Sequence, residues 1–134
     1  MQRSHRADAM SSSDEDTLRF IAASFTSIWA LELLLILKRM GGACTHQELI
    51  KKLHASQTVV TRAIDSLVAA GLVSDQADTA IYQPVSRSVS ANVEKTEELY
   101  LRRPDAVRRT IISRGSVVAR AFSGAFRLRK DSDD

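Results

Sequence analysis

The sequence has few residues that could join parts of the chain covalently or hold a metal. Its 134 residues include one cysteine, Cys44, so no internal disulfide can form, which is typical of a cytoplasmic protein. The three histidines, His5, His46 and His54, do not combine with Cys44 or with carboxylates at the spacing of metal ligands. We therefore predict no metal and no cofactor, and we expect the protein in the cytoplasm.

Other scarcities exclude whole classes of function. Aromatic residues make up 5% of the chain, too few for an RNA-binding surface that stacks bases. The histidines form no catalytic constellation with a serine or with Cys44, and no Gly-rich phosphate loop is present. We therefore predict that the protein is not an enzyme. Only five glycines and two prolines interrupt a chain rich in helix formers, which indicates a mostly α-helical fold.

Length and charge limit the remaining choices. A chain of 134 residues suffices for one hydrophobic core, which predicts a single domain over residues 14–130. Residues 1–13 and 131–134 lack hydrophobic periodicity and are expected to be tails, the first disordered and without the apolar core of a signal peptide. The net charge of +3 permits an anionic partner but is far below that of a non-specific nucleic-acid protein.

The longest apolar stretch runs over residues 20–37 and raises the question of a membrane span. Glu32 lies within it, together with three hydroxyl residues at positions 24–27. One central acid costs about 2.5–3.5 kcal/mol on insertion scales, and eighteen residues is close to the lower limit for a span. We therefore predict no membrane span but N-terminal helices over residues 14–42, broken near residues 24–27 and covered in part by a second subunit.

Residues 56–73 show the clearest helical pattern. Ser56 is suited to cap the start of this helix, and Gly71 to end it. At about 100° per residue, one face is predicted to be buried and comprises Val60, Ile64, Leu67 and Val68. The opposite face is predicted to be free for contact and comprises Thr58, Thr61, Arg62 and Asp65.

The neighbouring segments complete a motif over residues 43–85. Thr45 and Glu48 have the spacing of a capping box, which predicts a short helix with Leu49, Ile50 and Leu53 turned inward. After the second helix, two short apolar runs separated by a polar turn at 74–79 predict a β-hairpin ending near residue 85. Helix, helix and hairpin follow one another in the order of a winged helix-turn-helix.

Residues 45–82 resemble the MarR-like winged helix-turn-helix transcriptional regulators. Their recognition helix follows the pattern Ser-x-x-Thr-Val-x-Arg and then Leu-x-x-x-Gly-Leu-Val. The matching residues here are Ser56, Val60, Arg62, Leu67, Gly71, Leu72 and Val73, with Val59 in place of the threonine. The resemblance implies a regulator that binds double-stranded DNA. The wing departs from the family, because it carries Asp75 and Asp78 in place of a basic residue. Either the wing is too short to reach DNA, or this fold binds another protein in place of DNA.

A winged helix places its second helix in the major groove. The residues that we predict to bind DNA from this helix are Ser56, Gln57, Thr58, Thr61 and Arg62, and those flanking it are Thr45, Lys51, Lys52 and Arg87. The alternative for Arg62 is a surface ion pair with Asp65. His46 is expected to be exposed to solvent, and it could also contact the DNA backbone.

Residues 86–130 are predicted to form three C-terminal helices. The first begins among residues 86–90 and exposes Glu94, Lys95, Glu97 and Glu98. Pro104 precedes the second, over 105–114, and Ser116 is suited to cap the third, whose apolar stripe includes Val118, Phe122 and Phe126. The many arginines of residues 102–129 are an ordinary solvated face, a second phosphate-binding surface or a patch spanning a dimer.

Together these patterns predict a sequence-specific DNA-binding transcriptional regulator. The apolar surface over residues 29–37 suggests a homodimer formed through the N-terminal and C-terminal helices, which would read two half-sites. The alternative is an interaction module in which the same fold binds another protein of a regulatory or transcription complex. A redox role for Cys44, near the start of a helix, is a further alternative to simple burial.

Overall fold

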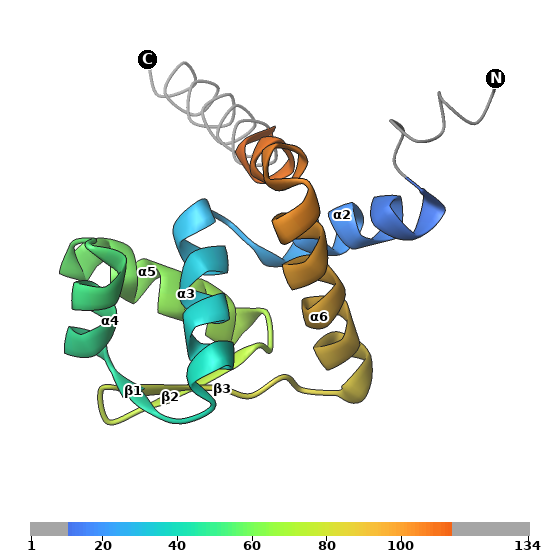
Figure 1. The fold of residues 1–134 in the computed structure, drawn as a ribbon. Helices are drawn as coiled ribbons and strands as arrows, with labels where there is room; N and C mark the ends of the chain where they lie inside the picture. The colour runs from blue at the N-terminus through green and yellow to red at the C-terminus, as the bar shows by residue number, and fades with distance from the viewer. Residues whose placement is uncertain (1–10, 114–134) are drawn as a thin grey trace, which may run out of the picture.

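The computed structural model describes residues 11–113 and has a mostly α-helical fold with a small sheet (Figure 1). Its elements in order are α2 (Ser12–Ser24), α3 (Ile28–Met40), β1 (Cys44–Thr45), α4 (His46–Leu53), α5 (Gln57–Ala69), β2 (Val73–Gln76), β3 (Thr79–Tyr82) and α6 (Arg87–Arg102). The chain is helical again over residues 104–113. The predicted fold class is confirmed: a winged helix-turn-helix with additional helices on both sides.

Several sequence-based expectations lie outside the described residues. They are the first ten residues of the N-terminal tail, the helix capped by Ser116 with its apolar stripe, and the tail at 131–134.

Hydroxyl side chains cap the N-terminal ends of helices α2 to α6. The Ser27 hydroxyl accepts a hydrogen bond from the Ala30 amide at 3.2 Å, and the Ser56 hydroxyl one from the Val59 amide at 3.2 Å. Ser11 caps α2 in the same way, so that helix begins at Ser12, two residues before the acidic run that suggested its start. Such caps satisfy amide donors that have no partner inside the helix, and they define where each helix begins.

The predicted break near residues 24–27 is confirmed. Helix α2 ends at Ser24 and α3 begins at Ile28, and the two axes meet at 104°. Across residues 11–113, none of the helices taken singly has the length and apolar character of a membrane span. The bent pair of α2 and α3 meets those criteria by length and composition only.

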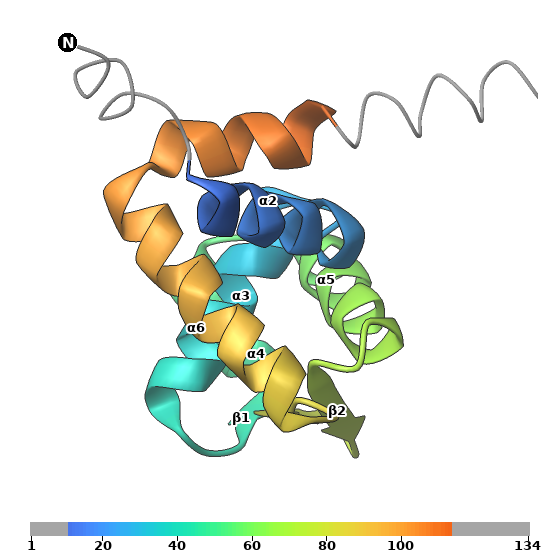
Figure 2. The same cartoon turned by 90° about the vertical axis from the view of Figure 1, so that its right-hand side faces the viewer.

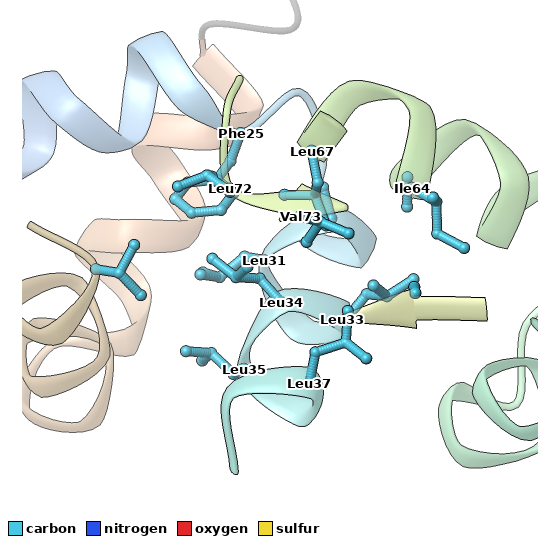
Figure 3. Packing of buried hydrophobic residues seen from close by; sticks show 14 of the residues in the cluster. Phe25, Leu31, Leu33, Leu34, Leu35, Leu37, Ile64, Leu67, Leu72 and Val73 are labelled. Carbon is cyan, nitrogen blue, oxygen red and sulfur yellow. The ribbon is translucent and has the colours of Figure 1, made fainter. Parts of the chain in front are cut away.

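Helix α3 forms the centre of the core and is covered within one chain. Its leucines at positions 31, 33, 34, 35 and 37 are all buried (Figure 3). Helices α4 and α5 pack against α3, as does strand β3, while α2 packs on α6 (Figures 1 and 2). The expectation that a second subunit covers residues 29–37 is therefore wrong for the leucines. Trp29 and Met40, near the ends of α3, are the large apolar side chains of this helix that are exposed, each by 42%.

The sheet has three antiparallel strands in the order β1-β3-β2. Cys44 pairs with Ala80 and Val73 with Tyr82, so β1 and β2 lie on either side of β3. The turn is tighter than predicted, because it is made at Ala77 and Asp78, whose positive φ angles of 51° and 65° suit a two-residue hairpin. Strand β1 was not predicted, since a two-residue strand has no hydrophobic periodicity.

Ion pairs join α3 to α6. Glu97 accepts hydrogen bonds from Lys38 Nζ at 2.9 Å and from Arg39 Nε at 3.1 Å. The side chain of Glu97 is 19% exposed, so the prediction that it lies on an exposed face is wrong. Hydrogen bonding from Lys38 is the main cause that holds the pKa of Glu97 below its usual value, and the same contact raises the pKa of Lys38.

We expect Glu97→Gln to lower the free energy of unfolding by about 1 kcal/mol at neutral pH. A lowered carboxyl pKa stabilises the folded state above the unfolded-state pKa, and this stabilisation is lost as the pH falls through the folded-state pKa. The difference between wild type and variant should therefore shrink in acid. Urea unfolding at neutral pH and in steps below about pH 5 measures it. A difference that stays constant into acid would contradict this role for Glu97.

Glu32, the acid within the apolar stretch, has a partner on α6. Tyr100 donates a hydrogen bond from its hydroxyl to Glu32 Oε2, and the Arg108 guanidinium lies 5.7 Å from the Tyr100 ring centre. Burial is the main cause that raises the pKa of Tyr100, and the contact with Glu32 adds to it. The acid is therefore held by a polar contact within the fold.

Candidate nucleic-acid interface

Helix α5 has the two faces that its sequence predicted. Val60, Ile64 and Leu67 are buried, as is Ala63 between them. The opposite side is exposed along its length and comprises Gln57, Thr58, Thr61, Arg62 and Asp65. The helix therefore holds polar and cationic side chains on a rigid element, directed away from the core.

Val68 is an exception, because the prediction that it is buried is wrong. Its side chain is 44% exposed. Val68 lies about 80° around the helix from Val60, which puts it at the edge of the apolar stripe. The helix ends one residue later at Ala69, and Gly71, with φ of +76°, turns the chain into the wing.

Arg62 is exposed and presents its guanidinium from the N-terminal half of α5. Within residues 11–113 it forms no ion pair with Asp65 or with any other acid, so the alternative of a surface pair is not observed. An arginine in this state keeps its planar set of donors for an external acceptor.

Arg62 also borders a hollow between the start of α3 and α5. The hollow measures about 250 Å³ and is lined by Thr26, Ser27, Trp29, Val59, Arg62 and Ala63. Trp29 was not singled out as a neighbour of the predicted interface, because it belongs to an apolar run and was assigned to a covered surface. Its exposure of 42% beside Arg62 depends on the packing of α3 on α5, which has no local signal in the sequence.

Helix α4 packs beside α5 and adds two cations. Lys51 and Lys52 lie in its last turn, and both are exposed. The hydroxyls of Thr45 and Ser56 cap α4 and α5, as predicted, and the contact of these two residues with DNA stays a prediction. The structure thus brings the lysines and the exposed face of α5 into two adjoining helices.

Arg87 is separated from these residues. It is exposed and is the first residue of α6, which lies on the opposite side of α3 from α4 (Figures 1 and 2). It does not join the surface of α4 and α5 in one subunit, and its contact with a DNA backbone stays a prediction.

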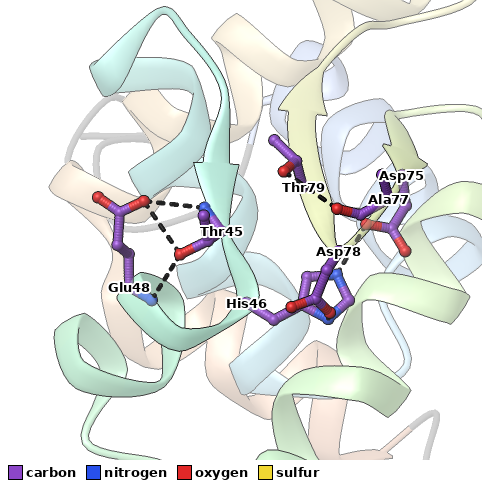
Figure 4. Close-up of polar contacts among 7 residues, drawn as sticks. All are labelled: Thr45, His46, Glu48, Asp75, Ala77, Asp78 and Thr79. Carbon is purple, nitrogen blue, oxygen red and sulfur yellow. Dashed lines mark hydrogen bonds and ion pairs between the residues drawn. The ribbon is translucent and has the colours of Figure 1, made fainter.

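The two acids of the wing are held by a histidine (Figure 4). His46 Nε2 lies 2.7 Å from Asp75 Oδ1, and His46 Nδ1 lies 3.0 Å from Asp78 Oδ1. The side chain of His46 is 17% exposed, so the expectation that it is exposed to solvent is wrong. The cause is the hairpin, which folds back onto the start of α4 and lets the His46 amide donate to the Asp78 carbonyl at 3.1 Å.

Cys44 is buried in β1 with 1% exposure. Burial is the main cause that raises the pKa of its thiol. A reactive cysteine needs a lowered pKa and access to solvent. The structure therefore favours simple burial of Cys44 over a redox role.

Comparison with known protein families matches residues 25–79 to the MarR family. The match begins at Phe25, before α3, and ends at Thr79 in the wing, so it covers the helix-turn-helix and the helix that supports it. No curated protein and no solved structure matches the chain significantly.

Proposed function

We propose that the protein is a transcriptional regulator that reads a specific site on double-stranded DNA as a homodimer, and the match of residues 25–79 to the MarR family supports this proposal. The observation that carries the proposal is the exposed N-terminal half of α5, where Arg62 has no acidic partner among residues 11–113. The proposal includes a cytoplasmic location, one domain over residues 14–130, and no enzymatic activity or cofactor.

In this proposal α5 enters the major groove with its N-terminal half toward the base edges. The Arg62 guanidinium donates two parallel hydrogen bonds to O6 and N7 of a guanine, and the Gln57 amide pairs with an adenine. Thr58 and Thr61 reach a thymine methyl or a phosphate. Lys51 and Lys52 on α4, with Thr45, hold the phosphate backbone and set the position of α5.

The homodimer is supported by apolar surface on the C-terminal side of the fold. Leu101 on α6 is 73% exposed, and Ile112 in the helix over residues 104–113 is 62% exposed. A contiguous apolar patch is typical of a surface that another chain covers, and we propose that Leu101 and Ile112 belong to such a patch. A two-fold dimer would present two α5 helices to half-sites about one helical turn apart.

We expect a double variant, Leu101→Glu with Ile112→Glu, to weaken self-association at least about tenfold, since two charges would enter an apolar contact. Sedimentation equilibrium of the wild type and the variant measures this. Met40→Glu is the matched control, because Met40 is also exposed but lies at the end of α3. An equal effect of both changes, or a monomeric wild type, would contradict this dimer surface.

Selection from genomic DNA tests the proposed function. The purified protein is mixed with genomic duplex fragments, and the retained fragments are sequenced across a salt series. A palindromic site whose retention falls steeply with salt is the expected result, because phosphate contacts release counterions. Weak binding without sequence preference, lost at physiological salt, would contradict the proposal.

The alternative of a protein-binding module was based on the acidic wing and on the modest net charge of +3. The contacts of Asp75 and Asp78 with His46 give these carboxylates a role inside the fold. Nothing else among residues 11–113 favours that alternative over DNA.

A further inference from the structure

We propose that His46 is a proton-dependent clasp that holds the acidic wing on α4 and makes DNA binding stronger as the pH falls. The proposal rests on the proposed function for its second part. The first part, the clasp, concerns the folded protein alone.

The geometry of the clasp uses both nitrogens of one imidazole ring. Nε2 faces Asp75 on β2, and Nδ1 faces Asp78 in the turn between β2 and β3 (Figure 4). The two carboxylates face different nitrogens of the ring, one from strand β2 and the other from the turn that follows it. Their side chains differ in exposure, with Asp75 24% and Asp78 71% exposed.

A neutral imidazole has one N–H donor and one acceptor nitrogen. It can therefore donate to only one of the two aspartates, and its other nitrogen then faces a carboxylate with no hydrogen between them. The protonated ring donates from both nitrogens and satisfies both carboxylates. The proton comes from solvent.

Other charged groups near the ring do not replace these contacts. On its own helix, the Glu48 carboxylate is directed to Thr45, where it accepts from the amide at 3.0 Å and from the hydroxyl at 3.1 Å. Lys51 and Lys52 lie in the last turn of α4, away from His46 at its first residue. Within residues 11–113, the two aspartates are the acids in ion-pair contact with the ring.

A proton on His46 affects DNA binding through the charge of this cluster and through the position of the wing. With a neutral ring, the cluster of His46, Asp75 and Asp78 carries two negative charges, and with a protonated ring it carries one. The cluster lies at the start of α4, in the unit that the proposed function sets on the phosphate backbone. A proton on His46 therefore lowers repulsion of phosphates and fixes the wing against α4.

The clasp is tested first without DNA, by hydrogen exchange of the backbone amides of the β2–β3 hairpin. In the wild type we expect the protection factors of these amides to rise about threefold or more from pH 8 to pH 6. In His46→Gln the rise should disappear, because the glutamine amide does not gain a proton. Asp75→Asn is a second variant that should reduce the rise while leaving the ring in place. Wild-type hairpin protection that is independent of pH would overturn the clasp.

The second test uses the duplex recovered by genomic selection, with a scrambled duplex for comparison. Wild-type affinity should increase about threefold to tenfold from pH 8 to pH 6, and His46→Gln should lose most of that increase. His54→Asn is the matched control, since His54 lies at the end of α4 with φ of 52°, a conformation that asparagine tolerates. Its pH dependence should match that of the wild type.

The outcomes separate the two proposals. If His46→Gln keeps the wild-type pH dependence of affinity, the link between the clasp and DNA is overturned. If no duplex is bound at any pH, the proposed function fails and the link fails with it, while the hairpin exchange still decides whether His46 is a clasp.

Discussion

Replacing Leu67 with alanine is expected to lower the free energy of unfolding by about 2–5 kcal/mol. Leu67 has no exposed surface and belongs to the same buried cluster as Phe25 and Leu34 (Figure 3). Truncating it removes buried methyl groups where α5 packs against α3, and the surrounding helices can fill the space only in part. Urea unfolding followed by circular dichroism measures the loss.

Val68→Ala is the matched control for this change. Val68 is the next residue along α5, but its side chain is 44% exposed, so the substitution should cost less than about 1 kcal/mol. If Val68→Ala were as destabilising as Leu67→Ala, the orientation of α5 against the core would be wrong.

Replacing Arg62 with alanine is expected to lower affinity for the selected duplex by about 1–3 kcal/mol and to relax specificity at one base pair. Arg62 is exposed on α5 and has no acidic partner within residues 11–113, so its removal should leave the fold unchanged. Fluorescence anisotropy with the selected duplex and its single-base variants measures both effects.

Arg109→Ala removes the same charge from an exposed position outside the helix-turn-helix. It should lower affinity far less than Arg62→Ala and leave base preference unchanged. Equal losses in the two variants, with no change in base preference, would mean that Arg62 contributes only general charge.

Features that depend on neighbouring residues in the chain were predicted correctly from the sequence. Thr45 and Ser56 were recognised as caps because a cap needs only a hydroxyl and the amides of the next turn. The break at residues 24–27 and the buried position of Leu67 follow in the same way from local patterns.

Features that depend on distant contacts were missed or misjudged. Glu97 has the sequence environment of an exposed acid, and only the packing of α6 beside α3 brings it to Lys38. The side chain of His46 is held in a partly buried position by its contact with Asp75, which lies 29 positions further along the chain. The prediction that Val68 is buried was wrong for another reason. Val68 lies at the edge of the apolar stripe, where periodicity alone does not decide burial.

The same distinction between local patterns and distant contacts applies to the candidate site. The exposed face of α5 could be predicted residue by residue, because a helix fixes the direction of each side chain. The neighbourhood of Arg62 could not be predicted, since the hollow shared with Trp29 exists only when α3 and α5 are packed together. Nor could the sequence show that Arg87 starts a helix on the far side of α3 from α4.

The most direct test of DNA reading by α5 is a map of backbone amide chemical shifts during titration with the selected duplex, compared with a scrambled duplex. We expect the largest specific changes at Gln57–Arg62, with smaller changes at Lys51 and Lys52 that both duplexes produce. If the selected duplex instead changes mainly α6 and leaves the N-terminal half of α5 unaffected, α5 is not the reading element and the proposed function is wrong.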